Sequence, residues 1–322
     1  MSEPEGRGPS QPSGDPAGRG PGQPSDERTS ALAAANNLRA ITAVTLAMAS
    51  FAFGDTLMKL ASTSLPTSQL LFIRGGIVFT VSLAVAFFVG ALRELRHVFE
   101  RAMIGRVVGD VSGGWFFQSA LARLPYADLT AITQLGPMML TAASAIFLAE
   151  RVGWRRWTAT AVGLLGVLII VRPGGSTFGW WALVAIASVL GMTLRDLSTR
   201  RINRRVPAIL IMTVSAGAVT IAALAVAPFS DWQWPSQGLM LKLCCAAVFS
   251  LLGQLGIILA MRTGEVSAVV PFRYMIIPFS IISGVVVFGH FPDALTLLGI
   301  AIVVGAGLYT FYREQTLRRL SS

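Results

Sequence analysis

The sequence predicts an all-α polytopic membrane protein with ten transmembrane helices. Hydrophobic residues make up 53% of the 322 residues and charged residues 13%, and the mean hydropathy is +0.64. A soluble globule of this composition would lack the polar residues needed to cover its surface. Lipid offers no partner to an unpaired backbone group, so the spans are expected to be helices.

Ten apolar stretches follow one another, each close to the roughly 20 residues that cross a hydrocarbon layer. Charged loops bound most of them, two tryptophan pairs mark outer ends of later spans, and prolines interrupt the fourth and ninth. In order, they cover residues 40–61, 68–90, 103–122, 127–148, 155–172, 178–199, 207–228, 239–261, 266–288 and 294–312.

Arginines alternate between the two sides of these spans. The two tails and the even-numbered loops, with the span ends beside them, hold 19 arginines, whereas the odd-numbered loops and their adjoining span ends hold only Arg123 and Arg172. Lys242, at the outer end of the eighth span, is one further exception. Because short cytoplasmic loops retain Lys and Arg, we expect both termini to be cytoplasmic and the protein to lie in a bacterial inner membrane.

Residues 1–37 are predicted to be a disordered cytoplasmic tail, since their first 24 residues hold six prolines and six glycines and no apolar core. Residues 314–322 form the predicted C-terminal tail. The net charge of +10 is explained by the arginine-rich loops, so no nucleic-acid partner is expected. Cys244 and Cys245 are adjacent and lack the spacing of a metal or disulfide framework.

The two halves of the chain resemble each other at an offset of about 140 residues. A span broken by Pro137 is matched by a span containing Pro278, and a glycine-rich span follows each. Because each half has five spans, the second half enters the membrane from the opposite side. We therefore predict two inverted five-helix repeats, residues 38–173 and 174–313, an architecture typical of secondary transporters.

The chain also resembles the EamA-type branch of the drug/metabolite transporter superfamily over roughly residues 40–312. The most specific residues run from Leu124-Pro125-Tyr126-Ala127-Asp128 through Pro137 to Glu150, followed by a glycine-rich segment at 163–170; Phe72-Ile73-Arg74-Gly75 is also similar. The resemblance implies two inverted five-helix repeats that move small metabolites. His290 departs from the family, which more often has an acidic residue there.

Ionisable side chains inside the spans are candidates for coupling or gating, because such groups are costly in lipid and usually face a cavity or a partner. Asp55 and Lys59 are four residues apart and can pair on one helix face. Arg74 lies at a similar depth and could join Asp55, and Asp110 could pair with Arg106. The alternative for each is a structural ion pair or a side chain that reaches the interface.

Arg195 and Asp196 lie near the inner end of the sixth span. The 140-residue offset places Arg195 opposite Asp55 in the repeat, so the two could mark matching inner and outer gates.

The predicted substrate site lies at the two proline-interrupted spans. Arg273 and Tyr274 fall between Pro271 and Pro278, and Gln134 precedes Pro137. Prolines free backbone carbonyls and let a helix distort around a cavity. The alternative is a hydrogen-bonded cluster without a ligand. Further candidate lining residues are Trp115, Gln118 and Gln254.

No phosphate loop, nucleophile elbow or metal-binding pattern occurs in the sequence, so neither an enzyme nor a cofactor is expected. The function predicted is secondary active transport of a small anionic or zwitterionic metabolite, such as an amino acid or a vitamin, by alternating access. A multidrug exporter and a flippase or accessory subunit for a lipid-linked precursor are the alternatives. The expected partners are the substrate and the lipid bilayer; protons, a counter-substrate and a homodimer are left open.

Overall fold

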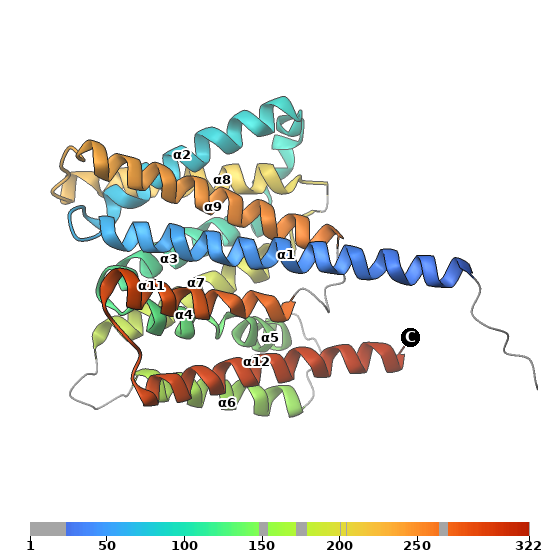
Figure 1. Ribbon diagram of the computed structural model, residues 1–322. Coiled ribbons are helices and arrows are strands. Elements are labelled where there is room, and N and C mark those ends of the chain that lie inside the picture. The colour runs from blue at the N-terminus through green and yellow to red at the C-terminus, as the bar shows by residue number, and fades with distance from the viewer. Residues whose placement is uncertain are drawn as a thin grey trace, which may run out of the picture.

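The computed structural model describes residues 24–147, 154–171, 179–199, 201–203, 205–263 and 270–321, and helices are the regular structure of these ranges (Figure 1). The elements are α1 (Pro24–Ala61), α2 (Thr67–Phe88), η1 (Ala91–Phe99), α3 (Arg101–Arg123), α4 (Tyr126–Thr133), α5 (Gly136–Phe147), α6 (Trp154–Val171), α7 (Trp180–Thr199), α8 (Ala208–Val226), η2 (Ala227–Phe229), α9 (Gln237–Thr263), η3 (Val270–Met275), α11 (Ile276–Phe288) and α12 (Ala294–Ser321).

Each of the ten predicted spans overlaps helical structure in the described residues, which confirms an all-α polytopic membrane protein. Five helices are individually long and apolar enough to cross a bilayer: α1 from Ala35, α2, α7, α8 with η2, and α9 as far as Ile257. Shorter apolar helices lie in α6, in the ninth predicted span and in α12.

The fourth and ninth spans are broken, as their prolines predict. The fourth divides into α4 and α5 at Gln134-Leu135, and Pro137 is the second residue of α5. The ninth changes from the 3-10 turn η3 to α11 at Met275, and Pro278 is the third residue of α11. Proline is tolerated in the first turn of a helix because the N–H groups there have no intrahelical partner. Both breaks therefore precede a proline by a few residues.

The terminal helices extend further than the sequence analysis expects. α1 already begins at Pro24, within the predicted tail, and α12 continues to Ser321. Adding residues to a formed helix costs far less than nucleating one, and Ala31 to Ala35 include strong helix formers. The boundary between the predicted halves, at residues 173–174, lies outside the described residues.

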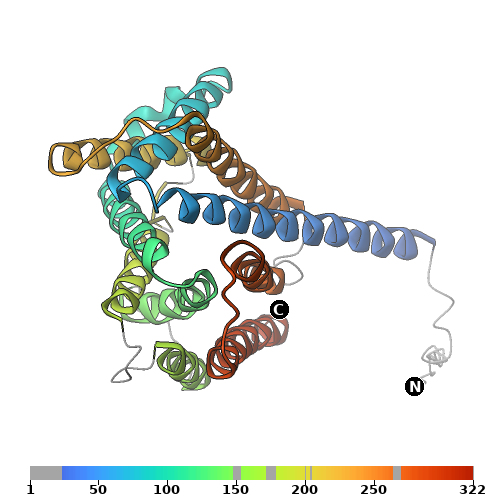
Figure 2. The ribbon, with the colours of Figure 1, turned by 60° about the vertical axis from the view of Figure 1, so that its left-hand side comes forward.

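Helices from the two halves of the chain pack in pairs. The main pairs are α3 with α7, α1 with α9, α2 with α8, and α6 with α12. Figures 1 and 2 show α6 and α12 together on one flank of the molecule. The start of α1 and the end of α12 point to the same end of the molecule (Figure 1), as an even number of spans requires.

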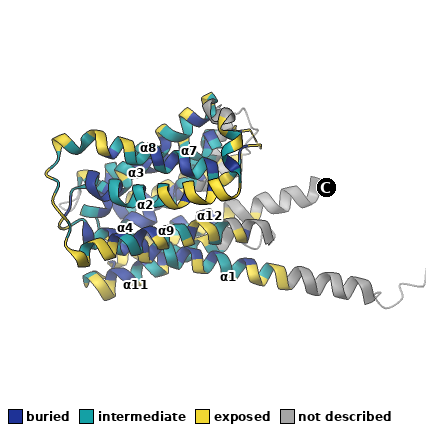
Figure 3. Ribbon diagram, turned by 90° about the horizontal axis from the view of Figure 1, so that it is seen from above, coloured by how far each residue is buried: buried dark blue, intermediate teal, exposed yellow. Residues whose placement is uncertain are grey.

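Apolar side chains cover much of the outer surface. On α9, one exposed stripe consists of Leu241, Val248, Leu252, Leu255 and Leu259. Other exposed apolar residues lie on α8 and on the second half of α2, where Figure 3 shows exposed segments. This pattern is expected of helices that face lipid, because lipid does not penalise an exposed leucine. Trp180 and Trp234 are also exposed.

Candidate functional site

Arg273 stands at a helix break and has no ion-pair partner among the described residues. It belongs to η3, two residues before Met275, and its side chain is exposed. Among the residues that the structure describes, no ion pair or hydrogen bond holds its guanidinium. The charges of Asp196 and Arg195, from α7, nevertheless act on it. Arg273 is thus available to an anionic group.

A charged cluster on α3 and α7 lies beside this arginine. We call Arg106, Asp110, Arg195 and Asp196 the inner cluster. The Asp110 carboxylate lies 3.8 Å from Arg106 Nη2 and 3.6 Å from Arg195 Nη1, so it bridges the two helices. Arg195 also pairs with Asp196, with Nε donating at 2.8 Å. The predicted Arg106–Asp110 pair is confirmed, and Arg195 is an additional partner.

Thr199 closes the inner cluster at the end of α7. Its hydroxyl accepts a hydrogen bond of 2.5 Å from Arg106 Nη1 and donates one of 2.6 Å to the Arg195 carbonyl. Together with Arg273, the region holds three arginines and two aspartates, which leaves one positive charge in excess. The arrangement therefore favours a ligand that carries negative charge.

Glycines allow α3 and α7 to bring these charges together. A Cβ on Gly109 would collide with the Arg195 backbone nitrogen and would lie 2.7 Å from the Gly191 carbonyl oxygen. A Cβ on Gly113 would lie 2.9 Å from the Met192 nitrogen. The absence of side chains at these positions brings the two backbones into contact. Asp110, next to Gly109, is thereby placed beside Arg195.

Gln134 and Tyr274, the other two predicted binding residues, occupy different surroundings. Gln134 is half-buried and its backbone nitrogen caps α4 by hydrogen bonds to the Thr130 and Ala131 carbonyls. The Tyr274 hydroxyl fills the space that a Cβ on Gly307 of α12 would occupy. Tyr274 therefore packs towards α12, whereas the adjacent Arg273 stays exposed.

The three further lining candidates differ in how far their side chains are exposed. Trp115 is half-buried and lines an apolar groove of about 370 Å³ along α3, with Val111 and Phe116. Gln254 is exposed on α9. Gln118 is almost fully buried, and neither its amide nitrogen nor its amide oxygen has a partner among the described residues. A buried amide in this state is a place where water or a ligand can supply the missing hydrogen bonds.

Lys59 connects three helices at the opposite end of the molecule. Its ammonium donates hydrogen bonds of 2.6 Å to the Leu121 carbonyl and 2.5 Å to the Leu124 carbonyl, at the end of α3. It also lies 5.5 Å from the centre of the Phe288 ring, at the end of α11. A cation is favourable at helix C-termini, where carbonyls lack intrahelical partners. Lys59 therefore joins the ends of α1, α3 and α11.

Asp55 does not form the predicted ion pair with Lys59. Its Oδ2 instead accepts a hydrogen bond from the hydroxyl of the buried Tyr126, at 3.3 Å. The charge of Arg74 acts on Asp55, as the sequence suggests, although these two described residues lie beyond ion-pair distance. Asp55 and Lys59 share a helix face but do not pair, because the carbonyls at the end of α3 accept the hydrogen bonds of Lys59 instead.

The sequence alone indicates no role for Tyr126 and no link between Asp196 and Arg273. Tyr126 follows Pro125 at the start of α4, within the motif that carries the family resemblance, so its position in the motif was the available signal. The proximity of Asp196 to Arg273 depends on how α7 packs, which no local pattern encodes.

Comparisons with known proteins agree with this architecture. Residues 38–172 match the EamA-like transporter family. A riboflavin transporter of Rhizobium johnstonii is 26% identical over 81% of this chain and 85% of its own length. An S-adenosylmethionine uptake transporter of Rickettsia felis is 25% identical over 84% of this chain and 91% of its own length. A pseudopaline exporter of Pseudomonas aeruginosa is 27% identical over 80% of this chain and 92% of its own length.

A solved crystal structure shares the fold. It covers 87% of this chain and 99% of its own, with a TM-score of 0.58 and 20% sequence identity. The helices, the two proline-associated breaks and the family match are consistent with one another. Over residues 38–172, and through its relatives, the chain is similar to the EamA-like transporter family.

Proposed function

We propose that this protein is a secondary transporter that moves a small anionic or zwitterionic metabolite across the membrane by alternating access. The observation that carries the proposal is Arg273, an exposed and unpaired cation at the break of the ninth span. A charge at this depth in a bilayer is costly unless something compensates it. A negatively charged group of the substrate would do so.

Two inverted repeats are part of the proposal, and the packing supports them. A shift of 140 residues converts the Gly113–Gly191 contact into Gly253–Phe51, which is also a contact. The Gly163–Ala306 contact converts into Gly166–Val303 in the same way, and this contact is present too. The pair α3–α7 corresponds to α1–α9 under the same exchange. Inverted repeats allow a protein to exchange two conformations around a central site.

The positions of Lys59 and Arg273 support a particular state of the transport cycle. Lys59 holds the ends of α1, α3 and α11 together on the side that we propose is periplasmic. Arg273, nearer the proposed cytoplasmic side, is exposed. We propose that this conformation is closed to the periplasm and that release of Lys59 accompanies opening.

The sequence suggests two acids, Asp55 and Asp110, that could couple transport to a proton, and Asp55 is the better candidate. Asp110 bridges Arg106 and Arg195, so neutralising it would leave two cations without their partner. Asp55 forms no ion pair with another described residue, and its bond from Tyr126 is the contact that a proton would alter. We propose that Asp55 takes up and releases the coupling proton.

The relatives suggest a panel of test ligands but not one substrate. They include uptake transporters and an exporter, so we propose the class of activity and leave the direction to the experiment. S-adenosylmethionine carries an amino-acid carboxylate, whereas riboflavin carries none. If Arg273 recognises a carboxylate, the protein should prefer ligands of the former kind.

Thermal-shift binding with the purified full-length protein tests the role of Arg273, because a ligand raises apparent stability by mass action. The panel consists of S-adenosylmethionine, amino acids, riboflavin and nucleosides. We expect a carboxylate-bearing ligand to bind, and Arg273→Gln to weaken its affinity about tenfold or more, since a charged hydrogen bond contributes about 1.5–3 kcal/mol. Arg273→Lys should lose less of this affinity, because it keeps the positive charge. Equal affinity in wild type and Arg273→Gln would remove Arg273 from the site.

A further inference from the structure

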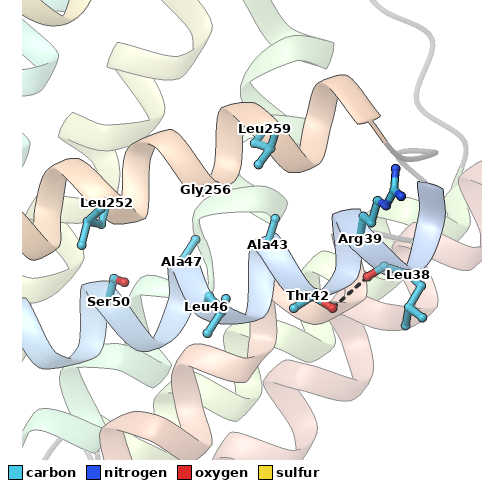
Figure 4. A pocket seen from close by; sticks show the side chains of 10 residues that line it. All are labelled: Leu38, Arg39, Thr42, Ala43, Leu46, Ala47, Ser50, Leu252, Gly256 and Leu259. Atoms are coloured by element: carbon cyan, nitrogen blue, oxygen red, sulfur yellow. Dashed lines mark hydrogen bonds between the residues drawn. The ribbon is translucent and has the colours of Figure 1, made fainter. Parts of the chain in front are cut away.

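An apolar groove of about 680 Å³ runs between α1 and α9 at the end of the molecule where α1 starts. Its floor is closed by direct helix contact, because a Cβ on Gly256 would lie 2.9 Å from the Ala47 Cβ and 3.0 Å from the Ala43 carbonyl oxygen. Leu46 forms the wall on α1, and Leu252 and Leu259 form the wall on α9 (Figure 4). These three leucines are exposed.

The groove has the length of one bilayer leaflet. Figure 4 shows Arg39 at one end and Ser50 at the other. These residues are eleven positions apart on one helix, which corresponds to roughly 16 Å at 1.5 Å per residue. Half of a hydrocarbon layer of about 30 Å has nearly the same depth. A single extended acyl chain therefore fits the groove from the headgroup level to the middle of the membrane.

The groove carries a cation at its headgroup end. Arg39 is exposed, and no acidic side chain in the described ranges pairs with it. The Thr42 hydroxyl is already used, because it donates to the Leu38 carbonyl at 2.9 Å. Among the residues that line the groove, Arg39 is the one that can bind a phosphate by charge and by its fork of N–H donors.

We propose that this groove binds one anionic phospholipid of the leaflet on the Arg39 side, with an acyl chain between α1 and α9 and the phosphate on Arg39. A second copy of the chain fits this surface less well. Copies in the same membrane orientation that met through this groove would place their Arg39 side chains at the same depth, where the like charges repel. A lipid phosphate has the complementary charge.

Native mass spectrometry of the delipidated full-length protein tests the site, with dioleoylphosphatidylglycerol and dioleoylphosphatidylcholine as probes. Wild type should retain phosphatidylglycerol at least tenfold better than phosphatidylcholine. Arg39→Gln should bring the two lipids to the same level, and Arg39→Lys should keep part of the preference. Arg205→Gln is the matched control, because Arg205 is also exposed, lies outside the groove and precedes α8 at the same end of the molecule.

A second variant distinguishes the contribution of the apolar groove to lipid binding from the contribution of the Arg39 charge. Leu46→Ala with Leu259→Ala should weaken both lipids by a similar factor, because it removes the walls and leaves Arg39 in place. The proposal is overturned if wild type shows no preference for phosphatidylglycerol, or if Arg205→Gln loses as much of it as Arg39→Gln. It is also overturned if the protein forms lipid-free dimers that the leucine variant separates. None of these outcomes depends on transport, so they leave the proposed function untouched.

Discussion

At the residue scale, the environment of each charge decides its role more than its spacing in the sequence does. Lys59 lies on two carbonyls at the end of α3, and Asp55 accepts a hydrogen bond from Tyr126. Both charges lie on α1 with the spacing of a helical ion pair, yet each has a separate partner. This difference changes what mutation of the two residues should do.

We expect Asp55→Asn and Lys59→Met to have additive effects on thermal stability. Lys59→Met removes the donor of the Leu121 and Leu124 carbonyls, and charged hydrogen bonds contribute about 1.5–3 kcal/mol, so it should be the more destabilising change. Melting of the two single variants and the double variant in one detergent would measure the coupling. A coupling above about 0.5 kcal/mol, the usual error of additivity, would show that the two residues interact directly.

The surroundings of the candidate binding residues were partly predictable from the sequence. Arg273 could be selected because an arginine inside a span is costly in lipid and because the two flanking prolines favour a helix distortion there. The orientation of Tyr274 was not, since it depends on the space that Gly307 leaves on α12. Gln118 was identified as a polar residue in a span, but its lack of partners appears only once α3 is packed.

At the element scale, prolines and loop charges predicted the helices well, and the absence of stop signals made their ends uncertain. The breaks before Pro137 and Pro278 follow from the missing proline N–H and from the restricted residue before a proline. No comparable signal marks where α1 should begin, so its extension to Pro24 was missed. A 3-10 turn, η1, also occupies a stretch that was expected to be a loop.

Contact between α3 and α7 should depend on individual glycines. We expect Gly109→Ala to destabilise the protein by about 1–3 kcal/mol, the usual cost of overpacking, because its Cβ would collide with the Arg195 backbone. Gly114→Ala is the matched control on the same helix, since a Cβ there meets nothing within 4 Å. It should be neutral or stabilising by up to about 1 kcal/mol through helix propensity. Equal melting temperatures for the two variants would show that α3 and α7 are not in close contact.

At the scale of the whole molecule, the arginine distribution predicts one orientation in the membrane, with both termini cytoplasmic. With the native Cys244 and Cys245 replaced by serine, cysteines at Thr63 and Ser236 should react with an impermeant maleimide added to intact cells. A cysteine at Arg205 should react only after the cells are opened. Labelling of Arg205→Cys alone in intact cells would reverse the proposed topology.

The central claim is that the molecule transports a metabolite by alternating access, using Arg273 to bind it. Counterflow in proteoliposomes tests this claim most directly: vesicles are loaded with an unlabelled ligand from the binding panel, and entry of the labelled ligand is followed without ATP. We predict that wild type and Arg205→Gln transiently accumulate label above equilibrium, and that Arg273→Gln requires at least tenfold more ligand for the same rate. A wild-type protein that binds the ligand but shows no counterflow, or an Arg273→Gln variant with unchanged half-saturation, would contradict it.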